Sequence, residues 1–519
     1  MRLTGRLAAA PDDFVRREFL EPQFRHEVAH LLPWYVLIEK ALLREYHRLG
    51  VLSARQVEHL AYALGELTEE RVTAGAGAAL TDIALAMETR VTEALPEPVP
   101  AWHVDRSRND LQACAQLLYG RDQVSGIAAM LGELAEATLE QASRDVTSPM
   151  PGYTHLQSAQ IITPGFYLSA VAEHVLRVSS RLLATYDRIN FSPLGAGPMA
   201  GQELAWDRDW LAEAIGCAGP VPHALSAVAS REWLLDVAAD IASAGVGFSR
   251  VLTDLMAWSS SAYGLVELPD ELAGISAAMP QKKNYPILER LRGRTAHLTA
   301  FYVDFATGQR NTPYSNMVEV SKEAGLHAST MFGAIRAVLA GFTLVVDRLE
   351  WRTDRMRAVC EEDHFGGFGL ANELTLRAGV PWRTAQVIAG RYVTAVLARG
   401  DGGAGHGDPA ALAAAAREAG HPLDDPASYL TGSADVDAQL RAKVSAGSTS
   451  PDSVAALLAE QRKRLDALTA EWDARRAAVR EAVAATDAAV APGGEGEGRR
   501  GGHAEGRAPV GEAAAGEAV

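Results

Sequence analysis

The sequence predicts an all-α fold, because apolar residues recur at helical spacing over long stretches, whereas alternating strand patterns are scarce and short. Residues 168–189 and 335–349 place apolar side chains three, four or seven positions apart, as one face of a helix requires. A third observation is Ser450-Pro451-Asp452, which combines an N-cap residue, a first-turn proline and an acid that matches the helix dipole. The repeating apolar positions are Leu168, Val171, Val175, Val178, Leu182 and Ile189, followed by Ile335, Val338, Leu339, Phe342, Val345, Val346 and Leu349.

In order along the chain, the expected helical regions are separated by breaks. The proline-rich residues 96–101 end the first region, and the two apolar stripes form the middle of the chain. Glycine-rich residues 400–410 predict a flexible loop, after which a long helix is expected from residue 451 to about residue 490. Beyond residue 491 the Gly/Ala/Glu-rich tail has too few apolar side chains to offset the entropy of ordering, so we expect it to be disordered.

Composition restricts the class of protein. Asp and Glu total 65 against 49 Lys and Arg, and a net charge of −16 argues against a nucleic-acid partner. The three cysteines, Cys114, Cys217 and Cys360, are widely spaced and predict a reducing compartment rather than a disulfide framework. The N-terminus lacks the apolar core of a signal peptide, and the apolar stretch at residues 332–346 contains Arg336. We therefore expect a cytoplasmic protein with no membrane span.

Two densely polar segments in the first third of the chain carry groups suited to chemistry. In residues 103–110, Ser107, Arg108 and Asn109 offer a hydroxyl, a guanidinium and an amide, which together suit a carboxylate. In residues 152–157, Thr154 and His155 could form an acid–base unit, because imidazole titrates near neutrality. A solvated loop and a structural histidine are the respective alternatives.

Two further polar segments follow. In residues 274–284, small residues precede Met-Pro, which predicts a mobile loop, and Lys282 and Asn284 add anion-binding donors. The alternative is a basic surface loop. In the segment that begins at Tyr314, Glu319 and Lys322 would share a face if the segment is helical, and a simple ion pair between them is the alternative to a functional role.

Taken together and in this order, the segments resemble the argininosuccinate lyase branch of the fumarase/aspartase superfamily. The specific matches are RSRND at 106–110, GYTHLQ at 152–157 and SxxMPQKKN at 276–284. Weaker matches occur in Gly-rich residues 193–201, at Ser249-Arg250, and near residues 379–383 and 447–451. The resemblance covers roughly residues 60–480, which is most of the chain.

The resemblance implies a three-domain subunit with a central bundle of long helices, and 519 residues also suggest about three domains. We expect an N-terminal helical domain at 1–100, the bundle with the site motifs at 101–350, a C-terminal helical domain at 351–490 and the tail at 491–519. The resemblance further implies a homotetramer in which each active site draws on three subunits. The implied reaction releases fumarate from a succinyl compound without cofactor or metal.

The residue roles implied by the resemblance follow a β-elimination. Ser276 would be the general base that removes a proton from carbon, and His155 with Thr154 would protonate the departing nitrogen, although which of these two delivers the proton stays open. Fixed donors would stabilise the charge that builds on the substrate carboxylate. The residues expected to bind substrate are Ser107, Arg108, Asn109, Lys282 and Asn284 on the dicarboxylate side and Tyr314, Glu319 and Lys322 on the amine side.

Several departures from the family pattern concern the site. Glu319 replaces a Gln on the amine side, and Asp105 is expected to add a second acid there. The substrate is therefore hypothesised to be an N-substituted aspartate whose amine is not arginine. A true argininosuccinate lyase and a specialised lyase of secondary metabolism carry similar weight, while a non-catalytic structural relative and an adenylosuccinate lyase fit less well. The other departures are Ala84 for His, Val104-Asp105 for Thr-Gly, Ile275 for Gly, Ala277 for Ser, and Tyr285 before Pro286.

Overall fold

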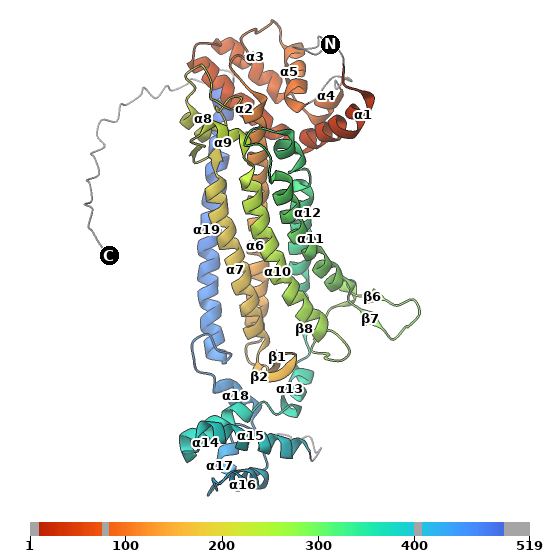
Figure 1. Cartoon of the computed structure of the whole chain (residues 1–519), viewed down its shortest axis with the longest axis vertical. Helices are drawn as coiled ribbons and strands as arrows, with labels where there is room; N and C mark the ends of the chain where they lie inside the picture. The colour runs from red at the N-terminus through yellow and green to blue at the C-terminus, as the bar shows by residue number, and fades with distance from the viewer. Residues whose placement is uncertain (1–9, 75–81, 399–406, 492–519) are drawn as a thin grey trace, which may run out of the picture.

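The computed structural model describes residues 10–74, 82–398 and 407–491, and its architecture is all-α, as predicted. Six long helices stand side by side and form an elongated bundle with a helical cluster at each end (Figure 1). The long helices are α6 (Arg108–Arg144), α7 (Pro164–Ile189), α10 (Glu232–Trp258), α11 (Pro286–Gln309), α12 (Ala328–Asp347) and α19 (Pro451–Val490).

The N-terminal end of α6 lies within the first cluster, which has its own apolar core. Its longest member, α2, packs against the start of α6 and against α3, and it carries several acids on its buried face. The elements of this cluster are α1 (Asp13–Val15), the π-helix η1 (Arg16–Leu20), α2 (Glu21–Arg48), α3 (Ala54–Gly65), α4 (Glu69–Ala74), α5 (Ile83–Ala94), α8 (Arg208–Ala214) and α9 (Ala224–Ala229).

The cluster at the opposite end of the bundle is built around α14 and α15, which have a separate small core. Part of the glycine-rich loop expected at residues 400–410, and the tail from residue 492, lie outside the described residues. The helices of this cluster are α13 (Thr353–Glu362), α14 (Gly367–Ala378), α15 (Trp382–Leu397), α16 (Pro409–Glu418), α17 (Ala427–Leu430) and α18 (Val436–Arg441).

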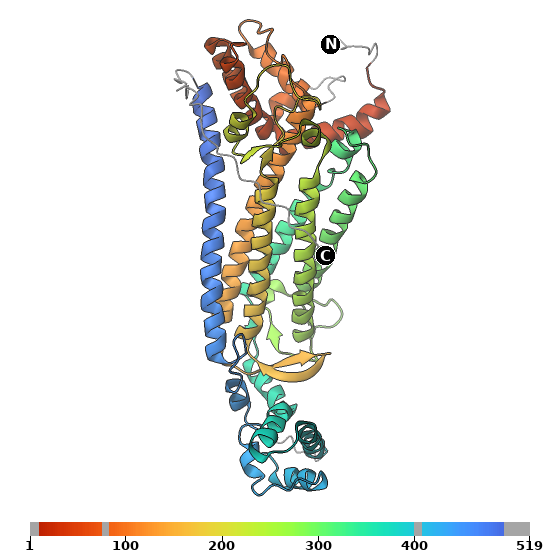
Figure 2. The ribbon, with the colours of Figure 1, turned by 60° about the vertical axis from the view of Figure 1, so that its left-hand side comes forward.

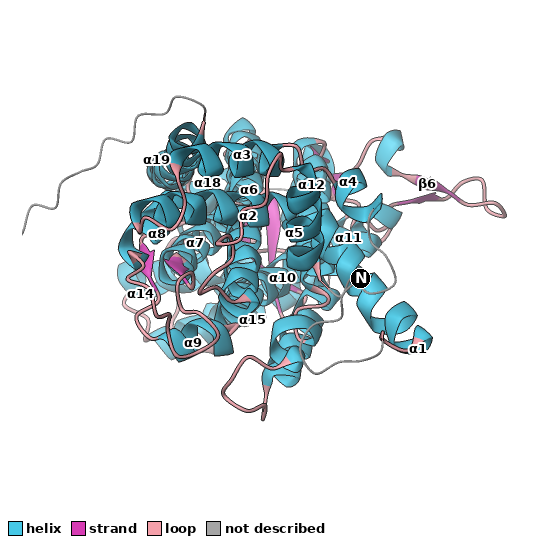
Figure 3. Ribbon diagram, turned by 90° about the horizontal axis from the view of Figure 1, so that it is seen from above, coloured by secondary structure: helices cyan, strands magenta, loops and turns pink. Residues whose placement is uncertain are grey.

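Strands in the described residues form only short two-stranded sheets. In β1–β2, an antiparallel hairpin at the far end of the bundle, Met150 is opposite Ile162 and Thr154 is opposite Gln157. In β6–β7, also antiparallel, Gly274 is opposite Asn284, and this hairpin stands off the side of the bundle (Figure 3). The strands are β1 (Met150–Thr154), β2 (Gln157–Ile162), β3 (Phe191–Ser192), β4 (Gly219–Pro220), β5 (Val266–Glu267), β6 (Gly274–Ile275), β7 (Lys283–Asn284) and β8 (Glu350–Trp351), with the 3₁₀-helix η2 (Asp270–Leu272) between β5 and β6, and β5 pairs with β8.

The apolar stripes predicted at 168–189 and 335–349 are the buried faces of α7 and α12, and the second stripe continues to Leu349 just past the end of α12. Every position of both stripes is buried, and all except Leu168 belong to the main core. The third predicted helix begins at Pro451 and ends at Val490, although Ser450 occupies the N-cap position without a capping hydrogen bond from its side chain. This helix, α19, runs along α6 and α7 (Figure 2) rather than staying with α13–α18. The domain limits at 100, 350 and 490 stay a prediction.

One helical stretch, Glu319–Asp347, is long and apolar enough to cross a membrane by length and composition. Many of its apolar side chains, from Met331 to Val346, pack into the main core, and Arg336 Nη2 donates to Gln123 Oε1 on α6 at 3.1 Å. In the described chain this stretch is thus a core helix of the bundle, and the absence of a membrane span stays a prediction.

Candidate active site

The first polar segment forms the start of α6. Ser107 is the N-cap, and its Oγ accepts a hydrogen bond from the Asn109 amide at 3.1 Å. Asn109 lies in the first turn and donates from Nδ2 to the Pro198 carbonyl at 2.9 Å. Arg108 forms an ion pair with Asp82, the residue that caps α5. Because these capping interactions fix the backbone, the segment is the ordered first turn of a helix rather than a solvated loop.

Buried charges hold this helix start in place. Arg106 and Glu39 on α2 form a bidentate ion pair in which both side chains are buried. Asp110, the third residue of α6, accepts hydrogen bonds from the Gly195 and Gly197 amides at 3.1 and 3.0 Å. Burial raises the pKa of Asp110 to about 7, against the lowering effect of these hydrogen bonds and of Arg106.

Asp105, which was expected to be a second acid on the amine side, instead holds a neighbouring loop through hydrogen bonds. Its carboxylate accepts hydrogen bonds from the Glu203 and Leu204 amides and from the Trp206 indole, at 2.8–3.1 Å. Although burial opposes the change, the bonds from Leu204, Glu203 and Trp206 lower the pKa of Asp105. The residue has φ +56°, a left-handed conformation that Asp tolerates better than most residues. The expectation was therefore wrong: this acid pins the loop at residues 202–206.

The second segment is the tip of the β1–β2 hairpin. Thr154 and Gln157 are the last paired residues, so His155 and Leu156 make a two-residue turn, and both have positive φ (53° and 60°). Such turns favour Asn-Gly, so a His-Leu pair is strained there. Both Thr154 and His155 are exposed, and their side chains make no hydrogen bond within the part of the chain that the structure describes. The turn therefore presents the Thr154 and His155 side chains to solvent.

The third segment is the loop of the β6–β7 hairpin. Ser276 Oγ accepts a hydrogen bond from the Met279 amide at 3.1 Å, and Asn284 Nδ2 reaches the Gly274 carbonyl at 3.4 Å. Lys282 is exposed, and Ile275, which replaces the family's Gly, is 94% exposed. The loop extends into solvent and makes few contacts with its own bundle, and its mobility stays a prediction.

The stem of this hairpin is held by charge. Lys283 Nζ contacts Glu267 Oε1 at 3.1 Å and Asp270 Oδ1 at 2.9 Å, and Arg352 contacts Glu267 Oε2 at 2.7 Å. The two lysines of the QKKN motif thus differ: Lys283 anchors the stem through ion pairs, whereas the Lys282 side chain forms no ion pair in the described residues.

The fourth segment contains a π-helix, η3 (Glu319–Glu323), closed by the Ala324 amide on the Glu319 carbonyl at 2.8 Å. In this wider turn, positions three apart no longer share one face. Lys322 forms its ion pair with Glu27 on α2, and the alternative of a Glu319–Lys322 pair is not observed in the described residues. Glu319 and Tyr314 are exposed.

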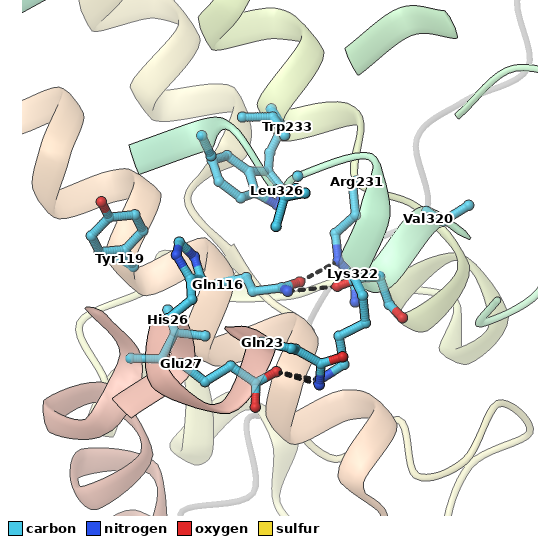
Figure 4. Close-up of a pocket in the computed structure, with 15 residues that line it drawn as sticks. Gln23, His26, Glu27, Gln116, Tyr119, Arg231, Trp233, Val320, Lys322 and Leu326 are labelled. Carbon is cyan, nitrogen blue, oxygen red and sulfur yellow. Dashed lines mark hydrogen bonds and ion pairs between the residues drawn. The ribbon is translucent and has the colours of Figure 1, made fainter. Parts of the chain in front are cut away.

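Glu27 is a residue that the sequence reasoning missed. It is 2% exposed, and besides Lys322 it receives Gln23 Nε2 at 3.3 Å and the Ile83 amide at 3.4 Å (Figure 4). Burial raises its pKa, while Lys322 opposes the rise. The available signal was an acid beside Val28, on the same face of α2 as Phe24 and Leu31, because acids are rare on a buried face unless they are paired.

A single protomer assembles only part of the predicted site. Ser107, Asn109 and Lys322 lie at one end of the bundle, and Gln112 Nε2 links α6 to η3 through the Ser321 carbonyl at 3.4 Å. His155 lies beyond the other end of α6, whose 37 residues separate it from Asn109 by about 55 Å. The Ser276 loop projects from the side of the bundle, apart from both groups. Within one chain the three specific motifs do not meet.

No group of three or more His, Cys, Asp or Glu side chains that could hold a metal ion occurs in residues 10–74, 82–398 and 407–491. A reaction without metal or cofactor stays a prediction.

The sequence of this chain is similar to those of known lyases. The family model described as "Lyase" matches residues 34–298. The argininosuccinate lyase of Thermus thermophilus is 31% identical over 76% of this chain and 86% of its own length. The argininosuccinate lyase of Hyphomonas neptunium is 30% identical over 80% of this chain and 88% of its own length.

Solved structures share the fold. A crystal structure of EDDS lyase in complex with formate superposes with a TM-score of 0.81 at 24% identity, covering 89% of this chain and 92% of that one. A fumarate lyase from Mesorhizobium sp. BNC1 gives a TM-score of 0.67 at 16% identity, over 84% of this chain and 97% of that one. The predicted fold class and enzyme class are confirmed. By its sequence relatives and its fold, the chain belongs to the argininosuccinate lyase family of the fumarase/aspartase superfamily and is a carbon–nitrogen lyase.

Proposed function

We propose that this lyase releases fumarate and an amine from an N-substituted aspartate, at active sites that three subunits of a cytoplasmic homotetramer share. The observation that carries the proposal is the outward display of His155 and Lys282 on two separate hairpins, each without a side-chain partner in the described part of its own chain. Groups of this kind, left without partners in one protomer, suit a site completed by neighbouring protomers.

The chemistry is a β-elimination. Ser276 Oγ takes the proton from the carbon beside one carboxylate, and negative charge builds on that carboxylate. The carbon–carbon double bond then forms as the carbon–nitrogen bond breaks, and the Thr154–His155 pair supplies the proton to the nitrogen. Ser107, Asn109, Lys282 and Asn284 would hold the dicarboxylate, because fixed donors in a closed site stabilise developing charge.

The Met279 amide supports the role of Ser276. A serine hydroxyl is a weak base, and a backbone N–H that already donates to Oγ at 3.1 Å stabilises its alkoxide form. Closure of the exposed loop over the substrate would add the charge of Lys282.

Exposed apolar side chains on the long helices support the tetramer. Val246 on α10 and Tyr302 and Val303 on α11 are exposed, and α11 buries few of its side chains in its own protomer. An apolar helix face of this kind is normally covered by another helix. The cysteines, which are buried and unpaired, suit a reducing cytoplasm.

The substrate test is fumarate release, followed by ultraviolet absorbance, from argininosuccinate and from a panel of other N-substituted aspartates. An amine other than arginine is favoured by Glu319, where the family has Gln, and by the pairing of Lys322 with Glu27. A higher kcat/KM for argininosuccinate than for the rest of the panel would refute the altered leaving group. Absence of fumarate from every compound would indicate a non-catalytic relative.

A further inference from the structure

The β1–β2 hairpin lies between the end of the bundle and the cluster α13–α18 (Figure 2). A two-stranded hairpin on its own is at most marginally stable in water, so the position of its turn depends on the elements that contact it. The turn is also strained, because His155 and Leu156 both have positive φ, and a strained conformation persists only where its surroundings hold it. The hairpin therefore needs support from outside to keep His155 in one place.

The base of the hairpin is anchored by apolar packing. Ile161 on β2 is buried in a small cluster with Phe365 and Val436, which belong to the cluster α13–α18. Arg357 on α13 and Asp437 on α18 form a bidentate ion pair at 2.9 and 3.2 Å, which ties together the two helices that contact the hairpin. This anchor fixes the start of the hairpin but lies several residues from the turn.

Nearer the turn, the hairpin is held by a hydrogen bond. Ser158 on β2 is opposite Tyr153, one step from the pair of Thr154 and Gln157 that closes the turn. The Ser158 hydroxyl donates to a carboxylate oxygen of Asp363, the C-cap residue of α13. Within the described part of the chain, this is the one side-chain hydrogen bond between the hairpin and another element.

The opposite strand is supported at the same level. Tyr153 packs edge-on against Tyr263, which lies between α10 and β5, and the two ring centroids are 5.5 Å apart. The residues next to the turn are thus held from two sides, by an aromatic contact with the bundle and by a hydrogen bond to the end of α13.

The backbone around Asp363 is itself fixed. The Asp363 amide donates to the Val359 carbonyl at 3.0 Å and closes the last turn of α13. Shortly after it, Gly366 lies so close to the Ser433 carbonyl that a Cβ atom would clash with the oxygen, so glycine is required there. Asp363 therefore offers Ser158 an acceptor whose position is set by the cluster α13–α18.

Helix stability does not explain an acid at this position. A carboxylate at the C-terminal end of a helix faces the negative end of the dipole, which is unfavourable. The neighbouring acids, Glu361 and Glu362, each pair with an arginine of α13, at 3.9 and 3.8 Å. Asp363 has no ion pair in the residues that the structure describes, so its hydrogen bond with Ser158 is the contact that uses the carboxylate.

We infer that Asp363 is a positioning residue for the elimination and acts through Ser158 by holding the turn that presents His155. This inference rests on the proposed function, in which the Thr154–His155 pair supplies the proton to the departing nitrogen. Asp363 does not touch the substrate. It favours cleavage of the carbon–nitrogen bond by keeping the proton donor in one position.

Two substitutions of Asp363 test the inference by fumarate release from the panel compound that the parent enzyme turns over best. Asp363→Ala removes the acceptor and should lower kcat about tenfold, because a small displacement of a reacting group is costly. KM should stay near the parent value, since the residues proposed to bind the dicarboxylate lie on other elements. Asp363→Asn keeps an oxygen that can accept from Ser158 and should restore most of kcat. Equal kcat in the two variants, or a change in KM alone, would overturn the inference.

The partner and a neighbour provide the matched comparisons. Ser158→Ala should lower kcat as much as Asp363→Ala does, and the double variant should lose no more than either single variant, because both changes remove one interaction. Glu362→Ala removes the adjacent exposed acid, which does not contact the hairpin, and should keep the parent kcat. Additive losses in the double variant would overturn the link through Ser158.

Amide hydrogen exchange distinguishes positioning from a loss of fold or assembly. In Asp363→Ala, peptides that cover residues 150–162 should exchange faster than in the parent, whereas exchange in α14 and α15, Tm and the mass of the oligomer should stay unchanged. Faster exchange throughout the cluster α13–α18, or dissociation of the oligomer, would show a merely structural role and overturn the inference. Unchanged exchange at residues 150–162 would overturn it as well.

Failure of this inference is distinguishable from failure of the function on which it rests. An active parent, an inactive His155→Ala variant and a fully active Asp363→Ala variant would overturn the inference and leave the proposed function standing. Absence of fumarate release by the parent from every compound of the panel would overturn both.

Discussion

Ser276 carries the hydroxyl on which the proposed proton abstraction depends. Replacing it by alanine should lower kcat by at least ~10²-fold, the usual scale for a general acid or base. The fumarate assay measures the change. Ser143→Ala, which removes an exposed hydroxyl near the end of α6, is a control that should retain parent activity. Near-normal turnover by Ser276→Ala would remove this residue from the mechanism.

The titration of Asp110 makes the free energy of unfolding depend on pH. Burial raises its pKa to about 7 in the folded chain from an ordinary value of 3.8, so the folded state favours the protonated acid. The stability linked to this group is fully present below about pH 4 and is lost as the pH rises toward 7. Asp110→Asn should remove that part of the pH dependence, as measured by Tm between pH 4 and 8.

The exposed cap Asp435→Asn serves as the control for Asp110 and should leave the profile of Tm against pH unchanged. The same slope in Asp110→Asn and in the parent would show that another group titrates in this range.

At the same scale, the sequence shows which residue types suit the chemistry but not which of them pair. RSRND and QKKN indicate donors for a carboxylate, yet Arg106 and Lys283 form structural ion pairs, whereas Asn109 and Lys282 are proposed to bind substrate. Glu27 and Lys322 lie 295 residues apart, and a local pattern has no information about a contact over that distance.

Among the elements, the β6–β7 hairpin depends on the charges at its stem. The hydrogen bond from Lys283 lowers the pKa of Glu267, which also pairs with Arg352. Exposed ion pairs contribute at most about 1 kcal/mol, so Glu267→Gln should change Tm little. It should lower kcat several-fold by loosening the loop that carries Ser276, and high salt should reproduce part of this loss in the parent.

The control for the stem is Glu140→Gln, which removes an exposed pair with Arg144 at the end of α6. Both variants are measured for kcat and Tm at low and high salt. An equal loss of kcat in the two variants would show that the stem has no special role.

The elements were predictable where one physical signal dominates. α7 and α12 follow from the apolar period, and the start of α19 follows from its proline and acid. The turn at His155-Leu156 was not predictable, because neither residue favours positive φ. Likewise, the sequence predicted one shared face for Glu319 and Lys322, and the π-helical turn separates them.

For the whole molecule, shared sites predict complementation between inactive chains. His155→Ala and Ser276→Ala should each be nearly inactive alone, whereas tetramers reassembled from both should regain partial activity. In some sites of the mixture, the intact His155 would come from a Ser276→Ala chain and the intact Ser276 from a His155→Ala chain. The measurement is fumarate release before and after the two variants are denatured and refolded together.

Ser276→Ala mixed with Lys282→Ala provides the matched control, since both residues lie in one hairpin loop. No site in that mixture receives an intact loop, so activity should stay low. Recovery in the control, or none in the first mixture, would contradict sites built from separate subunits.

At this scale the sequence predicted the parts of the site but not their distances. The order of RSRND, GYTHLQ and SxxMPQKKN indicates a lyase, yet only the fold reveals that α6 holds the first two at its opposite ends. A long helix holds two segments that are close in sequence far apart in space. The period of the apolar residues does not show how the subunits of an oligomer pack against one another.

The length of α6 has a consequence for newly synthesised protein. With the shared sites proposed above, a lone chain would be idle, because the hydroxyl, the imidazole and the amide assigned to the reaction stand too far apart to act on one molecule. Turnover per chain would then depend on concentration through mass action, falling steeply on dilution below the dissociation constant of the assembly. A cell could hold such an enzyme silent simply by making little of it.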